Sequence, residues 1–120
     1  MREITTHEVN GLNEALTITV MDEPGQGNAC HEYRIEVHGP VISVCDIHFQ
    51  NGPIKEVGVN GISNEALLAI VRDRLEGFQG GPFACLGNQY AIESVKWAME
   101  ALSRRTRKRV ERGVEGTNEP

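Results

Sequence analysis

The chain has 120 residues and a formal net charge of -5, and 39% of its residues are hydrophobic while 5% are aromatic. This length fits a single domain, residues 1–120, with a small core built on Leu, Ile and Val. So small a core favours a homo-oligomer, in which other copies cover part of the apolar surface. The sequence has no run of eighteen apolar residues and no apolar stretch in residues 1–10. We therefore expect neither a membrane span nor a signal peptide, and a cytoplasmic location.

Residues 1–60 predict an antiparallel β-meander of about four strands. Leu16, Ile18 and Val20 alternate with threonines, which is typical of a strand with one buried face. Similar alternation follows, and clusters of Gly, Pro and Asn separate the segments. The predicted strands cover residues 15–21, 31–37, 41–50 and 54–59, with Pro53 at the start of the last.

Residues 61–113 predict a hairpin of two helices. The first covers about 64–78, with Ser63 as its N-cap, and the second runs from about Asn88 to Arg112 and stops at Gly113. An apolar stripe follows the second helix for roughly six turns, ~37 Å at a rise of 1.5 Å per residue. The small sheet is too short to cover this stripe, so its distal turns are expected to pack against the same helix of another subunit. The stripe consists of Ile92, Val95, Ala98, Met99, Leu102, Thr106 and Val110.

These elements predict an α+β fold. An N-terminal antiparallel sheet is followed by a C-terminal two-helix hairpin that mediates oligomerisation. Residues 114–120 are expected to form a short polar tail.

Half of the basic residues lie within nine positions near the end of the second predicted helix, whereas residues 1–103 carry six basic and fourteen acidic side chains. The negative end of the helix dipole stabilises one or two such cations, but a larger cluster repels itself. A solvated helix end and a phosphate-binding site are both open interpretations. Arg105 and Arg109 lie four residues apart on one helix face, so their guanidinium groups could converge on a pyrophosphate. The run consists of Arg104, Arg105, Arg107, Lys108, Arg109 and Arg112.

A second candidate region, GGPFACLGN at residues 80–88, joins the two helices. Phe83 offers a ring on which a base can stack, and Asn88 can cap the second helix or bind a ligand. A hinge with a packed Phe and a capping Asn explains the same residues. Phe83 and Arg109 of one chain lie ~35 Å apart by helical rise, so a small ligand contacts both only where two subunits pair antiparallel.

Metal binding and catalysis have little support in the sequence. Cys45 and His48 fall on opposite faces of a predicted strand, and no CxxC or HxxxH spacing occurs. No nucleophile elbow, Gly-rich phosphate loop or paired-carboxylate motif is present. Cys30, Cys45 and Cys85 are too irregularly spaced for a disulfide framework, so buried thiols in a reducing compartment are expected. We expect no metal, no cofactor and no enzymatic activity.

Several segments, in their order along the chain, resemble a known family. HEYRI, FQNGPIKEVGVNG, EALLAIVRDRLEGFQ, GPFAC and RTRKRVERGVEGT are similar to the phage anti-Thoeris sponge proteins, the first family of Thoeris anti-defence proteins. The resemblance is most specific over residues 45–117 and covers nearly the whole chain. That family shares its C-terminal helical hairpin with a phage anti-CBASS sponge, and the strands before residue 60 favour the anti-Thoeris member.

The resemblance implies a protein that binds the cyclic ADP-ribose isomer (gcADPR) made by TIR enzymes and holds it without degrading it. It also implies a sheet packed against two helices, a homodimer or a hexamer built as a trimer of dimers, and in some members separate sites for cyclic di- or trinucleotides. By position, Phe83 and Asn88 fit the family's base- and ribose-contacting region. The phosphate-contacting end corresponds to Arg105, Thr106, Arg107, Arg109 and Thr117.

Two functions of other classes stay open. A small nucleic-acid-binding regulator could use the basic helix to follow phosphates, although nucleic acid is not the expected partner. The other is an enzyme that degrades nucleotides.

Overall fold

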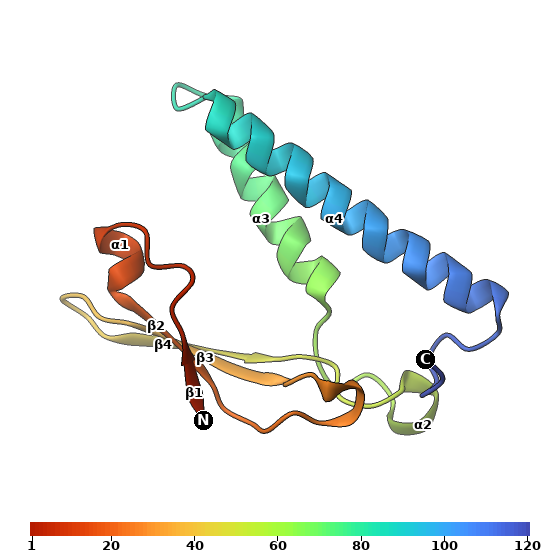
Figure 1. The fold of residues 1–120 in the computed structure, drawn as a ribbon. Coiled ribbons are helices and arrows are strands. Elements are labelled where there is room, and N and C mark those ends of the chain that lie inside the picture. Colours follow the sequence, from red (N-terminus) through yellow and green to blue (C-terminus); the bar gives the residue numbers. More distant parts are fainter. The chain divides into compact units, whose positions relative to one another are not determined.

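The computed structural model describes residues 1–120 apart from the side chain of Gln26, and it divides the chain into two compact units (Figure 1). The first unit comprises Met1–Gly52 and Val59–Ile62, and the second comprises Pro53–Gly58 and Ser63–Pro120. Along the chain the elements are β1 (Arg2–Ile4), α1 (Gly11–Glu14), β2 (Leu16–Val20), the 3-10 turn η1 (Gln26–Asn28), β3 (Glu32–Val37), β4 (Ser43–His48), α2 (Ile54–Val57), α3 (Asn64–Gln79) and α4 (Leu86–Glu111).

The first unit contains a four-stranded antiparallel sheet with the strand order β1-β2-β3-β4. Ile18 on β2 lies opposite Ile4 on β1 and Ile35 on β3, so apolar residues of neighbouring strands share one face. The next cross-strand pair, Thr19 and Arg34, belongs to the opposite, polar face of the sheet. The predicted antiparallel sheet and the α+β fold class are confirmed.

The prediction of a strand at residues 54–59 is wrong. This segment contains α2, in which the Val57 amide donates to the Pro53 carbonyl at 3.0 Å. Pro53 has φ -73°, which suits the entry to a helical turn, and Gly58 ends the turn at φ +75°. The fourth strand of the sheet is instead β1, which is too short to show an alternating pattern. Of the other predicted strands, 15–21 and 31–37 correspond to β2 and β3. The strand predicted at 41–50 corresponds to β4, which is shorter.

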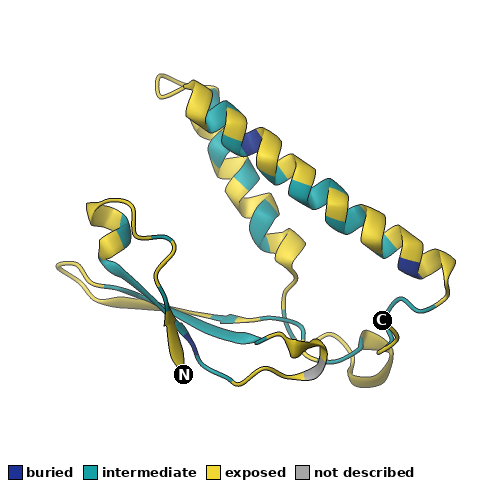
Figure 2. Ribbon diagram, viewed as in Figure 1, coloured by how far each residue is buried: buried dark blue, intermediate teal, exposed yellow. Residues whose placement is uncertain are grey.

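Burial within the sheet is concentrated on β2 (Figure 2). Val20 is fully buried, whereas β4, at the edge of the sheet, exposes Val44 and Cys45. Cys85 at the start of α4 is also exposed, and Cys30 is half-buried. The prediction of buried cysteines is therefore wrong for two of the three, because one lies on an edge strand and the other at a helix end.

In the second unit α3 and α4 lie side by side (Figure 1). Ser63 accepts a hydrogen bond from the Ala66 amide at 3.1 Å, which confirms it as the N-cap of α3. Gly113 follows α4 with φ +71°, and this confirms the predicted stop. The core of the hairpin includes Ile92, which is 6% exposed.

Two details of the helical hairpin differ from prediction. Cys85, and not Asn88, is the N-cap of α4, which therefore starts two residues earlier than expected. Val110 is 60% exposed and lies outside the packed stripe. No helix in the described part of the chain is long and apolar enough to cross a membrane.

Candidate functional site

Arg109 is the buried centre of the cationic end of α4. It is 8% exposed, and its guanidinium group donates five hydrogen bonds to the segment that follows the helix. Nε donates to the Glu115 carboxylate at 3.0 Å, and the two terminal nitrogens donate to the main-chain oxygens of Val114, Thr117, Glu119 and Pro120. Residues 114–120, expected as a polar tail, are thus folded around this guanidinium. We call them the C-terminal loop.

The C-terminal loop also contacts α2. The Lys55 amide donates to the Gly116 carbonyl at 3.2 Å, and Gly116 has a left-handed φ of +79°. A Cβ atom at Gly116 would lie 3.0 Å from Ile54 Cγ1 and 3.2 Å from Lys55 Cγ, which is closer than side chains normally pack. Two segments far apart in the sequence therefore meet beside Arg109.

The other cations of the basic run are exposed, and some of them have partners. Arg104 and Arg107 both donate to Glu100, at 3.0 and 3.2 Å, and the Arg104 guanidinium lies 5.0 Å from the centre of the Trp97 ring. Hydrogen bonds from Arg107 and Arg104 lower the pKa of Glu100. Arg107 also donates to Ser103 at 2.9 Å.

Arg105 and Lys108 are exposed, and the described residues make no ion pair or hydrogen bond with either side chain. Thr106 is half-buried on α4. The Thr117 hydroxyl donates to the Val114 carbonyl and accepts from the Glu119 amide at 3.3 Å. Among the predicted phosphate contacts, the structure thus brings Arg109 and Thr117 together directly and leaves Arg105 as an exposed cation on the same helix.

The tip of the hairpin carries the predicted base-contacting residues. Phe83 is 73% exposed, and the Asn88 side-chain amide donates to its carbonyl at 3.1 Å, so these two residues do lie together. Phe83 meets Phe78 edge to face, with ring centres 6.5 Å apart, and the Arg74 guanidinium lies 5.1 Å from the centre of the Phe78 ring. An open cleft of about 310 Å³ is lined by Arg74, Gly77, Phe78, Gly81, Pro82 and Phe83.

The tip and the C-terminal loop lie at opposite ends of α4. The helix has 26 residues, and at 1.5 Å per residue it separates them by ~39 Å. One chain therefore presents an aromatic region and a cationic region that a small ligand cannot contact at once.

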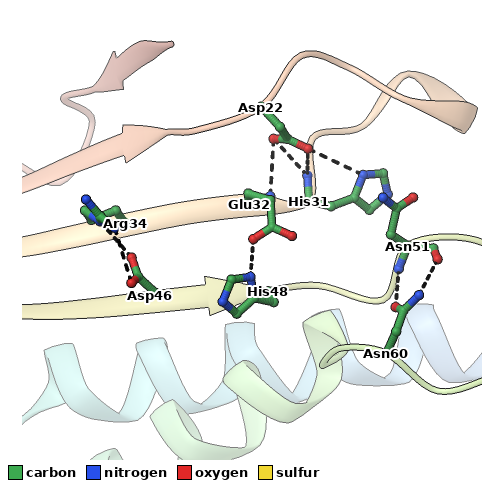
Figure 3. Close-up of polar contacts among 8 residues, drawn as sticks. All are labelled: Asp22, His31, Glu32, Arg34, Asp46, His48, Asn51 and Asn60. Atoms are coloured by element: carbon green, nitrogen blue, oxygen red, sulfur yellow. Dashed lines mark hydrogen bonds and ion pairs between the residues drawn. The ribbon is translucent and has the colours of Figure 1, made fainter.

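A separate polar cluster lies on the sheet unit (Figure 3). Arg34 donates to Asp46 at 2.7 Å, His48 pairs with Glu32, and Asn51 and Asn60 exchange hydrogen bonds. Asp22 accepts from the His31 amide at 2.9 Å and from the Glu32 amide at 3.2 Å. Desolvation favours the neutral acid, but these amides outweigh it and lower the pKa of Asp22. In the described part of the chain no group of three His, Cys, Asp or Glu residues is arranged to hold a metal ion, and we interpret the cluster as structural.

Sequence reasoning missed Glu115 and Lys55. Glu115 lies three residues after the end of the cationic run, in a segment bounded by Gly113 and Gly116, and this is a signal that the chain folds back on that run. Lys55 was missed because residues 54–59 were predicted to form a strand. Pro53 and Gly58, on either side of IKEV, indicate a short turn instead.

The structure defines a small α+β protein whose helical hairpin has an exposed aromatic ring at one end and clustered cations at the other. No protein-family model matches the chain. Over 73 residues the chain is 47% identical to the protein named Thoeris anti-defense 1 from Bacillus phage SBSphiJ7. The matched stretch is 61% of this chain and 51% of that relative, so the comparison spans about half the relative's length. The resemblance to the phage anti-Thoeris family is confirmed by this match.

Proposed function

We propose that this chain is a phage anti-defence protein that binds and sequesters a cyclic ADP-ribose signal of the gcADPR type, made by TIR enzymes, without degrading it. The observation that carries the proposal is the 47% identity to Thoeris anti-defense 1. The exposed ring of Phe83 and the cations at the other end of α4 support it, because a cyclic ADP-ribose has a planar base and a pyrophosphate.

A protein that acts by sequestration must outcompete a receptor for its ligand. Nanomolar affinity corresponds to about -12 kcal/mol. Exposed cations are screened by water and salt and do not supply this alone. An aromatic face, charge-assisted hydrogen bonds and a pocket closed to water together supply it, and none of them requires a general base.

The closed pocket requires a second copy of the chain. Because ~39 Å separate the two regions of one helix, an antiparallel partner must bring its cationic end to the aromatic tip. Large apolar side chains exposed on the hairpin support such pairing, since monomeric proteins seldom expose many of them. These include Ile70, Tyr90 and Trp97, which are 65%, 62% and 61% exposed.

Trp97 also lines a groove of about 620 Å³ between the helices. We propose a homodimer as the binding unit, which in a hexamer would be repeated three times. Cyclic di- or trinucleotides would bind at separate sites.

The test combines calorimetry, light scattering and chromatography. Purified protein should bind gcADPR with submicromolar affinity and a stoichiometry set by the dimer. Heating the complex should release the ligand unaltered, because a sponge performs no chemistry. Recovery of ADP-ribose or smaller products would instead indicate an enzyme, and the absence of gcADPR binding would refute the proposal.

The exposed basic run also favours a second candidate, a small nucleic-acid-binding regulator. Such a protein would bind duplex DNA with an affinity that falls linearly with salt on a log-log plot. We expect weak duplex binding with little sequence preference, and gcADPR binding that persists at salt concentrations that abolish the duplex complex.

A further inference from the structure

Arg109, the residue at the centre of the cationic end, uses all of its side-chain hydrogen-bond donors within the chain. All three guanidinium nitrogens donate within the chain, and the residue is 8% exposed. A guanidinium group has five N–H donors, and five hydrogen bonds use them. A phosphate that approaches this end of α4 must therefore be bound by other donors.

Lys55 lies beside the C-terminal loop, and its ammonium group is not engaged by the described residues. Its backbone amide donates to the Gly116 carbonyl at 3.2 Å, and a Cβ atom built at Gly116 would lie 3.5 Å from Lys55 Cε. The ammonium group is one bond beyond that carbon. The described residues make no ion pair or hydrogen bond with the Lys55 side chain.

We propose that Lys55 is a further anion-binding residue of the site, held against the C-terminal loop by α2 and directed at the phosphate groups of the ligand. The inference rests on the proposed function for the identity of the ligand, and on the geometry at Gly116 for the residue. A lysine ammonium is a compact point charge with three donors, suited to a phosphate oxygen. Contact between its stem and Gly116 reduces the side-chain entropy that binding would cost.

The anion that Lys55 recognises is a phosphate or pyrophosphate group. The Glu115 carboxylate of the C-terminal loop already pairs with another cation, Arg109. Lys55 thus adds a positive charge that has no ion-pair partner among the described residues, at the point where the C-terminal loop and α2 meet. Arg109 becomes a positioning residue, which folds the loop that Lys55 packs against.

The test is Lys55→Gln, which keeps most of the stem and removes the charge. Inorganic pyrophosphate and gcADPR are the probes, and each should bind about five- to tenfold more weakly, with a smaller dependence on salt. Lys55→Arg should retain most of the affinity. Lys96→Gln, in the groove midway along α4, is the control and should bind both probes as the wild type does.

A second readout follows the ammonium itself. Acetylation of the wild-type protein, read by mass spectrometry, should be slowed at Lys55 by pyrophosphate and unchanged at Lys96. Equal affinity of Lys55→Gln and the wild type, or no protection of Lys55 by pyrophosphate, overturns the inference. Protection of Lys55 by pyrophosphate without any gcADPR binding would refute the proposed ligand and support the anion site. Binding of gcADPR with the same affinity to Lys55→Gln and the wild type would refute the role of Lys55 and support the proposed ligand.

Discussion

Arg109 donates from Nε to the carboxylate of Glu115 at 3.0 Å, six residues further along the chain, while the arginine itself is 8% exposed. A buried guanidinium needs a counter-charge and acceptors for its donors. The C-terminal loop supplies both, since Glu115 provides a negative charge and four main-chain oxygens provide acceptors. The cationic end of α4 is therefore a folded structure and not only a run of surface charges.

Removal of this guanidinium should release the C-terminal loop. Sequence reasoning predicts that Arg109→Ala weakens ligand binding by about 1.5 to 3 kcal/mol and preserves the fold. From the structure we expect weaker binding and, in addition, faster hydrogen exchange at the amides of Val114 and Thr117, which donate to carbonyls inside this region. Hydrogen exchange by mass spectrometry measures the second effect.

Glu115→Gln removes the counter-charge and keeps the guanidinium group, and urea unfolding measures its effect. We expect a loss of about 1 kcal/mol in the free energy of unfolding, modest because the Glu115 side chain is 41% exposed. Glu111→Gln, at the last residue of α4, is the control and should have little effect. Unchanged exchange in the Arg109→Ala loop would contradict the structural role that we assign to the guanidinium.

Phe83→Ala should weaken gcADPR binding and leave the oligomer size unchanged. The ring is 73% exposed at the hairpin tip, so it is available to stack on a base, and such stacking contributes about 1 to 3 kcal/mol. Calorimetry gives the affinity and light scattering gives the mass. Val41→Ala removes a comparably exposed apolar side chain from the sheet unit and serves as the control. If Phe83→Ala dissociated the oligomer, the ring would be a packing residue of the interface.

Acid should destabilise the sheet unit through Asp22. Desolvation opposes ionisation, but the amides of His31 and Glu32 lower the pKa of this carboxyl in the folded state. Its contribution to stability is therefore present above the unfolded pKa of about 3.9 and is lost as the pH falls through the folded pKa. Asp22→Asn should reduce the difference between urea midpoints at pH 7 and about pH 3. Asp73→Asn, on α3, provides the comparison, and an equal effect of both substitutions would rule out a specific role for Asp22.

Gly61→Ala should destabilise the sheet unit. A Cβ atom at Gly61 would lie 2.4 Å from the carbonyl carbon of Phe49 and 2.6 Å from the His48 oxygen, so backbone would have to move. We expect a loss of about 2 to 4 kcal/mol in the free energy of unfolding, measured with urea. Gly11→Ala has open space around the new methyl group and should be close to neutral. A small effect at Gly61 would mean that residues 59–62 do not lie against β4 as observed.

Local signals in the sequence predicted several elements correctly. The Ser63 N-cap, the Gly113 stop and the alternating pattern of β2 each depend on neighbours within a few residues, and the structure has all three. The same local reasoning failed at residues 54–59, where Ile54, Val57 and Val59, coming after the Asn51-Gly52 turn signal, were interpreted as a strand. Pro53 and Gly58 there favour a helical turn, and a segment so short contains too few periods to distinguish the two.

By itself the sequence determined the α+β class, the sheet and helical halves, the cationic run and the position of an aromatic residue at the hairpin tip, because periodicity, capping and charge are local properties. Only the tertiary structure decided that Arg109 is enclosed by the C-terminal loop and that Lys55 lies against Gly116. Those contacts join segments separated in the chain, and they depend on the path that left-handed glycines and backbone hydrogen bonds give to the loops.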